Sequence, residues 1–293
     1  MNSIYIEITD LCNLRCSFCP SSKKKNPRTF MREDLFRRSI LEAEKYVPQI
    51  YFHVLGEPTL HPEFSTFLNI LETTSLKLNL TTNGTTIKKN SEIILNSKAI
   101  RQINFSTHAY AELPEEVQKK YLNDVLDFTT NVSEKCPDLY INLRLWNAGD
   151  LKSEKFNQNF LKKINRTFKT NISLPEFSSH HKSFNIQNRI YLHQDSRFEW
   201  PENKQEQKEI VKGSCRALNT HVAILHDGRV VACCLDYNGN ITLGNINENS
   251  LEEILNTELA LNIKEGFEAN ELRHPFCKTC SFCKRFRTPP KKI

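Results

Sequence analysis

Apolar and polar residues follow two different periods along the chain up to about residue 200. Segments with a period of two are typical of strands, and segments in which apolar residues recur every three or four positions are typical of helices. Leu35, Phe36 and Ile40, for example, share one face of a predicted helix. Strands are predicted at residues 4–9, 50–55, 77–82, 100–106, 140–146 and 189–193. Helices are predicted at residues 32–46, 62–73, 91–96, 114–135 and 151–168.

This order of strands and helices points to an α/β fold. Strands that alternate with helices favour a parallel sheet whose connections are helical. Six such units fit a partial (β/α)6 barrel, because the common closed barrel has about eight. An open doubly wound sheet shows the same alternation, so periodicity alone leaves both architectures open.

The pattern changes in the last third of the chain. Residues 202–212 are polar and charged, which is typical of a linker or a short surface helix. Two short apolar segments then flank Asp227-Gly228, a dipeptide typical of hairpins, and residues 251–267 have a helical pattern. We therefore expect a small C-terminal α+β domain that is rich in cysteine. The predicted domains are residues 1–205 and residues 206–293.

Composition and charge narrow the class of protein only slightly. The 293 residues carry a formal charge of +6, and 25% of them are charged, an ordinary share for a globular protein. A mildly basic surface suits an anionic partner, although it is more often simply a solvated surface. The sequence starts with no signal-peptide pattern, and no apolar run is long enough to span a membrane. We therefore expect a cytoplasmic protein.

Ten cysteines are many for a cytoplasmic protein, and their placement is uneven. Cys12, Cys16 and Cys19 lie in a C-x3-C-x2-C spacing directly after the first predicted strand. Three thiolates in one loop can hold an iron–sulfur cube and leave one iron open, as a catalytic metal centre requires. From spacing alone, structural cysteines or a zinc site completed by a distant histidine are the alternatives.

The triplet and Phe18 before its last cysteine resemble the signature of the radical S-adenosylmethionine superfamily. The resemblance implies that Cys12, Cys16 and Cys19 hold a [4Fe–4S] cluster whose open iron binds S-adenosylmethionine. It further implies that reduction of this cofactor releases a 5′-deoxyadenosyl radical, which removes a hydrogen atom from a substrate.

Further segments resemble the family at successive strand ends. Gly56-Glu57-Pro58 is similar to the Gly-Gly-Glu motif that binds the amino group of the cofactor, although Leu55 replaces the first glycine. The resemblance also implies cofactor contacts for residues that follow or end later strands. These residues are Asn83, Ser106 and Arg144, with Phe18 beside the cysteines.

The cysteines beyond residue 210 resemble those of a SPASM domain, or of its shortened relative, the twitch subdomain, which binds one auxiliary [4Fe–4S] cluster. The resemblance implies four ligands: Cys215, Cys233, Cys277 and Cys280. Cys234 and Cys283 are left over, and either could replace a neighbouring cysteine as ligand or be an ordinary buried thiol. Cys283 is also a candidate catalytic residue that exchanges a proton or hydrogen atom with the substrate. A zinc ribbon on the same four cysteines is the alternative.

The resemblance therefore predicts a radical S-adenosylmethionine oxidoreductase or modifying enzyme with one auxiliary cluster. It implies a flavodoxin or ferredoxin as electron donor and a small molecule or peptide as substrate. RNA ranks lower, because the chain shows no added RNA-binding module. A non-catalytic protein stapled by zinc is the hypothesis from a different class.

Overall fold

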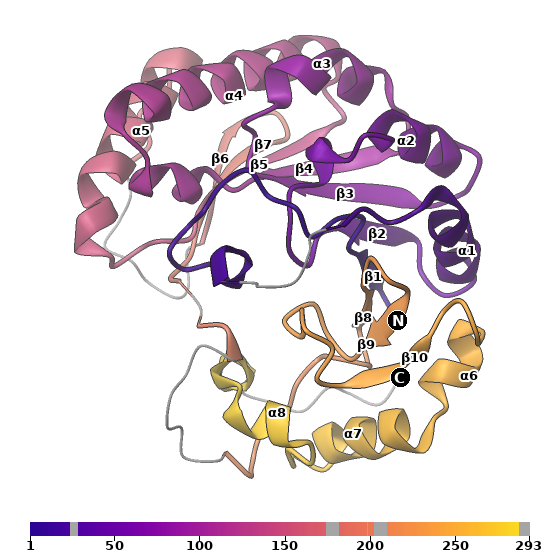
Figure 1. Cartoon of the computed structure of the whole chain (residues 1–293). Helices are drawn as coiled ribbons and strands as arrows, with labels where there is room; N and C mark the ends of the chain where they lie inside the picture. The colour runs from indigo at the N-terminus through magenta and orange to yellow at the C-terminus, as the bar shows by residue number, and fades with distance from the viewer. Residues whose placement is uncertain (24–28, 174–181, 198, 202–209, 287–293) are drawn as a thin grey trace. The chain divides into compact units, whose positions relative to one another are not determined.

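The computed structural model describes residues 1–23, 29–173, 182–197, 199–201 and 210–286. The chain forms two compact units, one from Met1–Lys77 with Phe198–Ile293, the other from Leu78–Arg197. Each is described by itself, with the element labels of Figure 1.

Unit 1 contains a mixed sheet in which strands from both ends of the sequence pair with each other. Its strands are β1 (Ser3–Ile6), β2 (Gln49–Phe52), β8 (His221–Ile224), β9 (Arg229–Val231) and β10 (Thr242–Asn245). Strand β1 pairs in parallel with β2 on one side and with β8 on the other, where Ile6 lies opposite Ile224. Strands β8, β9 and β10 follow one another in antiparallel order. The predicted hairpin at Asp227-Gly228 is thereby confirmed.

The described part of unit 1 has five α-helices, and the first two of them pack apolar side chains against this sheet. They are α1 (Glu33–Glu44), α2 (Phe64–Glu72), α6 (Leu251–Leu255), α7 (Glu258–Glu268) and α8 (Pro275–Thr279), with 3-10 helices η1 (Pro20–Lys23), η2 (Pro58–Leu60) and η6 (Ser281–Arg285). Phe36 of α1 and Phe67 of α2 stack with ring centroids 4.0 Å apart, and Phe52 of β2 meets Phe36 edge-on. All three rings are fully buried, so they anchor both helices to the sheet.

Unit 2 is a continuous segment with a mainly parallel sheet. Its elements are β3 (Lys77–Thr82), α3 (Ile87–Asn96), β4 (Ile100–Phe105), η3 (Thr107–Glu112), α4 (Glu115–Lys135), β5 (Tyr140–Leu145), η4 (Leu151–Ser153), α5 (Glu154–Phe168), β6 (Ser183–Gln187) and β7 (Ile190–Gln194). Strands β3, β4, β5 and β7 are parallel in this order, and β6 pairs antiparallel with β7 at the edge. Helices α3, α4 and α5 lie together on one face of this sheet (Figure 1).

The other face of the unit 2 sheet carries a row of polar side chains. Asn142 donates to Asn104 Oδ1 at 2.9 Å, and Asn104 donates to Thr81 Oγ1 at 3.4 Å. In the described part of unit 2, helices lie on one face of the sheet and polar side chains on the other, which favours a barrel-like sheet over a doubly wound one with helices on both faces. The α/β class is confirmed, and the partial (β/α)6 barrel stays a prediction.

Several predicted elements differ in detail from the structure. The helix predicted over residues 251–267 is two helices, because α6 ends at Leu255 and Thr257 caps the start of α7 by accepting a hydrogen bond from Ala260 N. Strands β6 and β10 were not predicted, since both are short edge strands that depend on antiparallel neighbours. Most of the polar segment 202–212 lies outside the described residues, as does the end of the chain after residue 286.

The predicted division at residue 205 differs from the two compact units. Strand β8 belongs to the predicted C-terminal domain, yet it forms the direct parallel neighbour of β1. Hydrogen bonding between strands therefore ties the cysteine-rich region to the first strand. The domain boundaries themselves stay a prediction.

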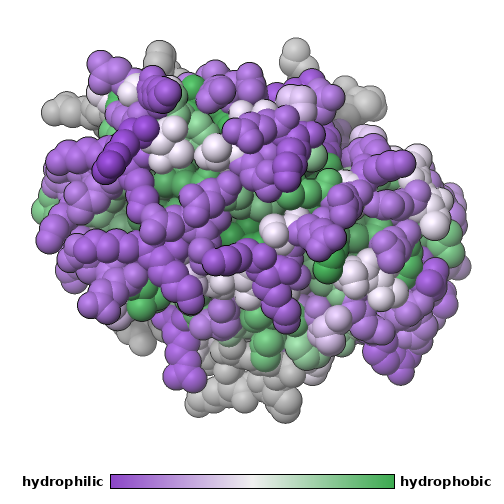
Figure 2. Space-filling model, turned by 90° about the horizontal axis from the view of Figure 1, so that it is seen from above, coloured by the Kyte–Doolittle hydropathy of each residue, from purple (hydrophilic) through white to green (hydrophobic). Residues whose placement is uncertain are grey.

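The surface agrees with the composition. Hydrophilic residues predominate on the face shown in Figure 2, with hydrophobic residues in smaller areas between them. In the part of the chain that the structure describes, no helix is long and apolar enough to cross a membrane.

One prediction follows from the turn after β3. Gly84 has φ +72°, and a Cβ there would lie 2.8 Å from both Tyr110 Oη and Val125 Cγ2. Gly84→Ala is therefore expected to lower the free energy of unfolding by about 3 kcal/mol, from backbone strain and overpacking together. Gly149→Ala is the matched control, because its φ is +82° with no atom within 4 Å, and should cost about 1 kcal/mol. Equal losses in anaerobic urea titrations of both variants would contradict the packing argument.

Candidate active site

The loop after β1 carries the three cysteines of the N-terminal triplet, Cys12, Cys16 and Cys19, all half-buried. The amide of Cys19 donates to the carbonyl of Cys16 at 3.1 Å, which closes the turn between them. The amide of Leu14 lies 3.5 Å from Cys12 Sγ and donates to it. Amide donors to sulfur are characteristic of iron–sulfur sites, where they stabilise the thiolate and tune the cluster. The loop therefore fits the predicted cluster.

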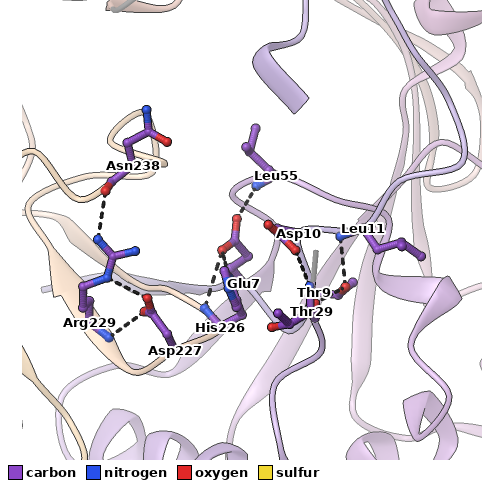
Figure 3. A network of polar contacts seen from close by, with 10 residues as sticks. All are labelled: Glu7, Thr9, Asp10, Leu11, Thr29, Leu55, His226, Asp227, Arg229 and Asn238. Carbon is purple, nitrogen blue, oxygen red and sulfur yellow. Dashed lines mark hydrogen bonds and ion pairs between the residues drawn. The ribbon is translucent and has the colours of Figure 1, made fainter. Parts of the chain in front are cut away.

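The base of this loop is held by a short antiparallel contact (Figure 3). Thr29 N donates to Asp10 Oδ1 at 2.8 Å, and Thr9 Oγ1 donates to Thr29 O at 2.8 Å. Asp10 and Thr9 are both buried, so these bonds are shielded from water. The segment that enters the loop and the segment that leaves it are thereby fixed together.

The Gly56-Glu57-Pro58 segment lies directly against the start of the cysteine loop. Gly56 has φ +74°, and a Cβ there would lie 2.1 Å from the carbonyl oxygen of Thr9. The amide of Glu57 donates to Leu11 O at 2.8 Å. Glycine is required at position 56 both by the left-handed backbone and by this close approach.

The Glu57 carboxylate is buried, with 1% of the residue exposed, and it caps η2. Its Oε1 accepts hydrogen bonds from Thr59 N at 3.2 Å and from Thr59 Oγ1 at 2.6 Å. These bonds fix the rotamer of a carboxylate that lies one residue from Gly56. A fixed carboxylate beside exposed backbone suits a cationic amine.

Unit 2 places the other predicted cofactor residues at the carboxyl ends of its strands. Asn83 follows β3, Ser106 follows β4, and Arg144 lies near the end of β5. Asn83 Oδ1 accepts from Thr85 N at 2.9 Å, and Tyr110 Oη donates to the carbonyl of Asn83. Carboxyl ends of parallel strands are where such folds build sites.

The Arg144 guanidinium stacks 4.5 Å from the centroid of the Trp146 ring, and Trp146 Nε1 donates to His193 Nδ1 at 3.4 Å. Burial, assisted by the charge of Arg144, lowers the pKa of His193, and burial lowers the pKa of His108 to about 4. Both rings are therefore neutral at pH 7. The sequence pattern had singled out Arg144 but not this neutral aromatic surface around it.

The C-terminal cysteines gather in unit 1. Burial, together with nearby Cys280 and Cys283, raises the pKa of Cys215 to about 11. Burial likewise raises the pKa of Cys277, with Cys215 and Cys280 as its nearest acidic neighbours. The pKa of Cys233 is raised by burial and by Cys234, Cys215 and Cys277. Thiols that are buried together ionise only when a cation lies among them. The iron of a bound cluster would supply that positive charge.

One apolar cluster in unit 1 lies beside both sets of cysteines. It includes Trp200, Leu225 and Tyr237, which are buried. Cys19 of the N-terminal triplet packs against it, and so do Cys233, Cys234 and Cys280. An apolar cluster beside two predicted metal sites would lower the local dielectric and keep water from both.

Among the described residues, no three His, Cys, Asp or Glu side chains lie close enough to hold a single metal ion. None of the ten cysteines, all of which lie in the described residues, forms a disulfide. A [4Fe–4S] cube takes each thiolate at a different iron, so its ligands stand further apart than those of one ion.

Two family models match the chain. One, described as the radical SAM superfamily, matches residues 6–150. The other, SPASM, is described as an iron–sulfur cluster-binding domain and matches residues 215–284. The chain belongs to the radical S-adenosylmethionine superfamily.

The resemblance seen in the sequence is thereby confirmed, and so is the SPASM-type C-terminal region. The protein is a radical S-adenosylmethionine enzyme whose cofactors are a [4Fe–4S] cluster, S-adenosylmethionine and auxiliary iron–sulfur. The description of the C-terminal model favours iron over the zinc ribbon.

Solved structures share this fold across nearly the whole chain. BtrN in complex with AdoMet and 2-DOIA aligns with a TM-score of 0.57 and 15% identity, covering 96% of this chain and 93% of that one. Native anSMEcpe with bound AdoMet aligns with a TM-score of 0.59 and 15% identity, covering 97% of this chain and 89% of that one. Streptococcus suis SuiB bound to S-adenosylmethionine aligns with a TM-score of 0.57 and 18% identity, covering 98% of this chain and 75% of that one. At these identities the likeness establishes the fold.

A curated relative matches a shorter stretch of this radical S-adenosylmethionine enzyme. It is the tungsten-containing aldehyde ferredoxin oxidoreductase cofactor-modifying protein of Pyrococcus furiosus, 38% identical over 87 residues. The match covers 29% of this chain and 24% of the relative.

Proposed function

We propose that this enzyme removes a hydrogen atom from a small-molecule or peptide substrate and oxidises or otherwise modifies it with the help of one auxiliary [4Fe–4S] cluster. When bound, S-adenosylmethionine and its cluster supply the 5′-deoxyadenosyl radical that accepts the hydrogen atom. The observation that carries the proposal is the apolar cluster of unit 1, which contacts cysteines of both predicted metal sites.

In this proposal the N-terminal triplet holds the cluster that binds S-adenosylmethionine. Gly56, Glu57 and Pro58 bind the cationic amino group, and the support is the fixed Glu57 carboxylate beside the triplet loop. Phe18, between two cysteines, is proposed to contact the adenine of the cofactor.

Three residues of unit 2 are proposed to contact the rest of the cofactor. Asn83 and Ser106 are polar residues at neighbouring strand ends, since Ser106 N donates to Thr82 O at 2.9 Å. Arg144 is proposed to bind the cofactor carboxylate. Its stacking on Trp146 limits the directions that the guanidinium can take, so it favours one orientation toward an anion.

The auxiliary set, Cys215, Cys233, Cys277 and Cys280, is proposed to hold the second cluster. Its role is to accept the second electron of a two-electron oxidation or to bind the substrate. Cys283 is proposed as the residue that exchanges a proton or hydrogen atom with the substrate. Its thiol donates to Cys280 O at 3.1 Å, which supports a position beside the auxiliary set.

This assignment makes Cys280 a cluster ligand and Cys283 a catalytic residue, and the two roles can be tested separately. Cys280→Ala is expected to remove about four iron atoms per chain, because a ligand of the auxiliary cluster is lost. Cys283→Ala is expected to keep all iron and to lose substrate modification while 5′-deoxyadenosine still forms. Iron and sulfide counts with product assays measure both. Loss of iron from Cys283→Ala and not from Cys280→Ala would contradict this assignment, because Cys283 would then be the cluster ligand and Cys280 would not.

A small molecule or peptide is the proposed substrate, and RNA ranks lower. The name of the Pyrococcus furiosus relative describes modification of a cofactor, which supports a small molecule. The half-buried rings of Trp146 and His193 suit a flat or apolar group, and the Arg144 guanidinium over Trp146 suits an anionic substituent on it. A flavodoxin or ferredoxin is the proposed electron donor, and the cytoplasm the proposed compartment.

The proposal is tested with the reconstituted enzyme under anaerobic conditions. S-adenosylmethionine and dithionite are added with either a small-molecule fraction or a peptide fraction of a cell extract grown in deuterated medium. Deuterium is expected in 5′-deoxyadenosine from the small-molecule fraction. Deuterium from the peptide fraction alone would assign a peptide substrate, and none from either fraction would contradict hydrogen abstraction from these classes.

A further inference from the structure

Glu7 is a fully buried carboxylate at the end of β1, five residues before Cys12. None of its surface is exposed, so its charge requires partners from within the protein. Glu7 Oε1 accepts a hydrogen bond from Leu55 N at 3.0 Å. Glu7 Oε2 accepts one from His226 Nδ1 at 2.7 Å. One carboxylate thus joins β1, the segment after β2 and the β8–β9 hairpin, as Figure 3 shows.

Leu55 is the residue directly before Gly56 and Glu57. The same segment is held at Gly56 by its close approach to Thr9 O and at Glu57 by the bond to Leu11 O. Three consecutive residues therefore rest on residues 7–11. A displacement of Leu55 would move the Glu57 carboxylate relative to the cysteine loop.

His226 lies in the tight turn of the hairpin. Gly228 N donates to Leu225 O at 2.9 Å, which closes the turn. Arg229 braces the turn on its solvent side, since its Nε donates to Asp227 Oδ2 at 2.7 Å and its Nη1 to Asn238 O at 2.8 Å. From this turn β9 runs on toward Cys233, so His226 and an auxiliary-set cysteine belong to one hairpin.

His226 Nδ1 lies 2.7 Å from Oε2 of the Glu7 carboxylate. Burial lowers the pKa of His226, but the hydrogen bond and charge of Glu7, with Asp10 and Asp227, outweigh it and raise the pKa above its usual value. A charged donor to a buried carboxylate is stronger than a neutral one. The two residues are 219 positions apart, and neither belongs to a cysteine motif.

We propose that Glu7 and His226 are positioning residues for S-adenosylmethionine: the hairpin of the cysteine-rich region holds Glu7, and Glu7 holds the Gly56–Glu57 segment in the conformation that binds the cofactor. The proposal rests on the assignment of Gly56 and Glu57 to the cofactor amino group made above. It adds that the auxiliary region supports cofactor binding through a side-chain contact, independently of electron transfer.

The test measures the dissociation constant of S-adenosylmethionine in reconstituted holoenzyme, from the change that it causes in the EPR spectrum of the reduced cluster. His226→Ala removes the side-chain donor to Glu7 and leaves only the longer bond from the His226 amide at 3.5 Å, so it is expected to raise the constant about tenfold. His226→Asn retains a nitrogen donor near the position of Nδ1 and is expected to stay within about twofold of wild type. Arg229→Ala is the matched control, because it disturbs the solvent side of the same turn without touching Glu7.

A second readout follows the segment itself. Hydrogen exchange of residues 50–60 in the holoenzyme is expected to be faster in His226→Ala than in His226→Asn, because the Leu55 amide loses a fixed acceptor. If His226→Ala does not retain its iron, His226→Gln takes its place, since its longer side chain moves the donor away from Glu7. His226→Gln should then bind S-adenosylmethionine about tenfold more weakly.

The variant Glu57→Gln distinguishes a failure of the positioning role from a failure of the assignment of Glu57 to the cofactor amino group. If Glu57→Gln weakens binding and His226→Ala does not, the positioning role is overturned and the assignment of Glu57 stands. Equal weakening in His226→Ala and Arg229→Ala would overturn it too, because general loosening of the hairpin would then explain the loss. If Glu57→Gln binds as wild type does, the assignment of Glu57 fails, and the positioning role fails with it.

Discussion

Replacing Cys12, Cys16 and Cys19 together by alanine is expected to lower the iron content of the anaerobically reconstituted protein from about eight atoms per chain to about four. The variant should also form no 5′-deoxyadenosine, because the cluster that binds S-adenosylmethionine is lost. The remaining iron would belong to the auxiliary set. Iron and sulfide analysis with an assay for 5′-deoxyadenosine measures both effects.

Cys136→Ala is the control for this experiment. Cys136 ends α4 and its thiol donates to Leu95 O at 3.8 Å, so it belongs to neither set of predicted ligands. It should keep about eight irons. About four irons in wild type and none in the triple variant would remove the auxiliary [4Fe–4S] cluster from the proposal. Zinc without iron in both proteins would contradict both sites.

Gly56→Ala is expected to lower the rate of S-adenosylmethionine cleavage about a hundredfold, although it removes no proposed side-chain ligand. The added Cβ would lie 2.1 Å from Thr9 O, so either the cysteine loop or the Glu57 segment must move. A displacement of about 1 Å at a reacting centre has this effect on rate. The measurement is 5′-deoxyadenosine formation per reduced cluster.

Gly149→Ala serves here as a control for backbone strain alone. It has a similar positive φ and no neighbouring atoms within 4 Å. Its cleavage rate should equal that of wild type. Cleavage by Gly56→Ala at the wild-type rate would show that the close approach to Thr9 does not position the site.

The sequence predicted the parts of the site that are local. Cys12, Cys16 and Cys19 lie within eight positions, and one loop after one strand is enough to gather them. Gly56 and Asn83 were found for a similar reason, since each stands in a short motif at a strand end. The strands and helices up to residue 168 were predicted because each has its own hydrophobic period.

Contacts between distant residues gave no such signal. Glu7 resembles an ordinary polar residue of an alternating strand, and His226 an ordinary hairpin residue, until the structure brings them to 2.7 Å. Trp146 and His193 likewise come together only because β5 and β7 pair. The break before Thr257 gives no signal in the apolar period, which continues through it. The helix restarts there because one side-chain oxygen, that of Thr257, caps α7.

The pairing of β1 with β8 also determines how the protein is made. Ile6 and its partner Ile224 are 218 positions apart, and a ribosome adds about 5–20 residues per second. One edge of β1 therefore stays unpaired for on the order of ten seconds or longer during translation, until β8 has been synthesised. An unpaired edge strand is a template for association with other chains. Continuous unit 2 can fold in that interval, whereas unit 1 depends on late completion, so chaperones or slow expression should improve the yield of monomeric protein.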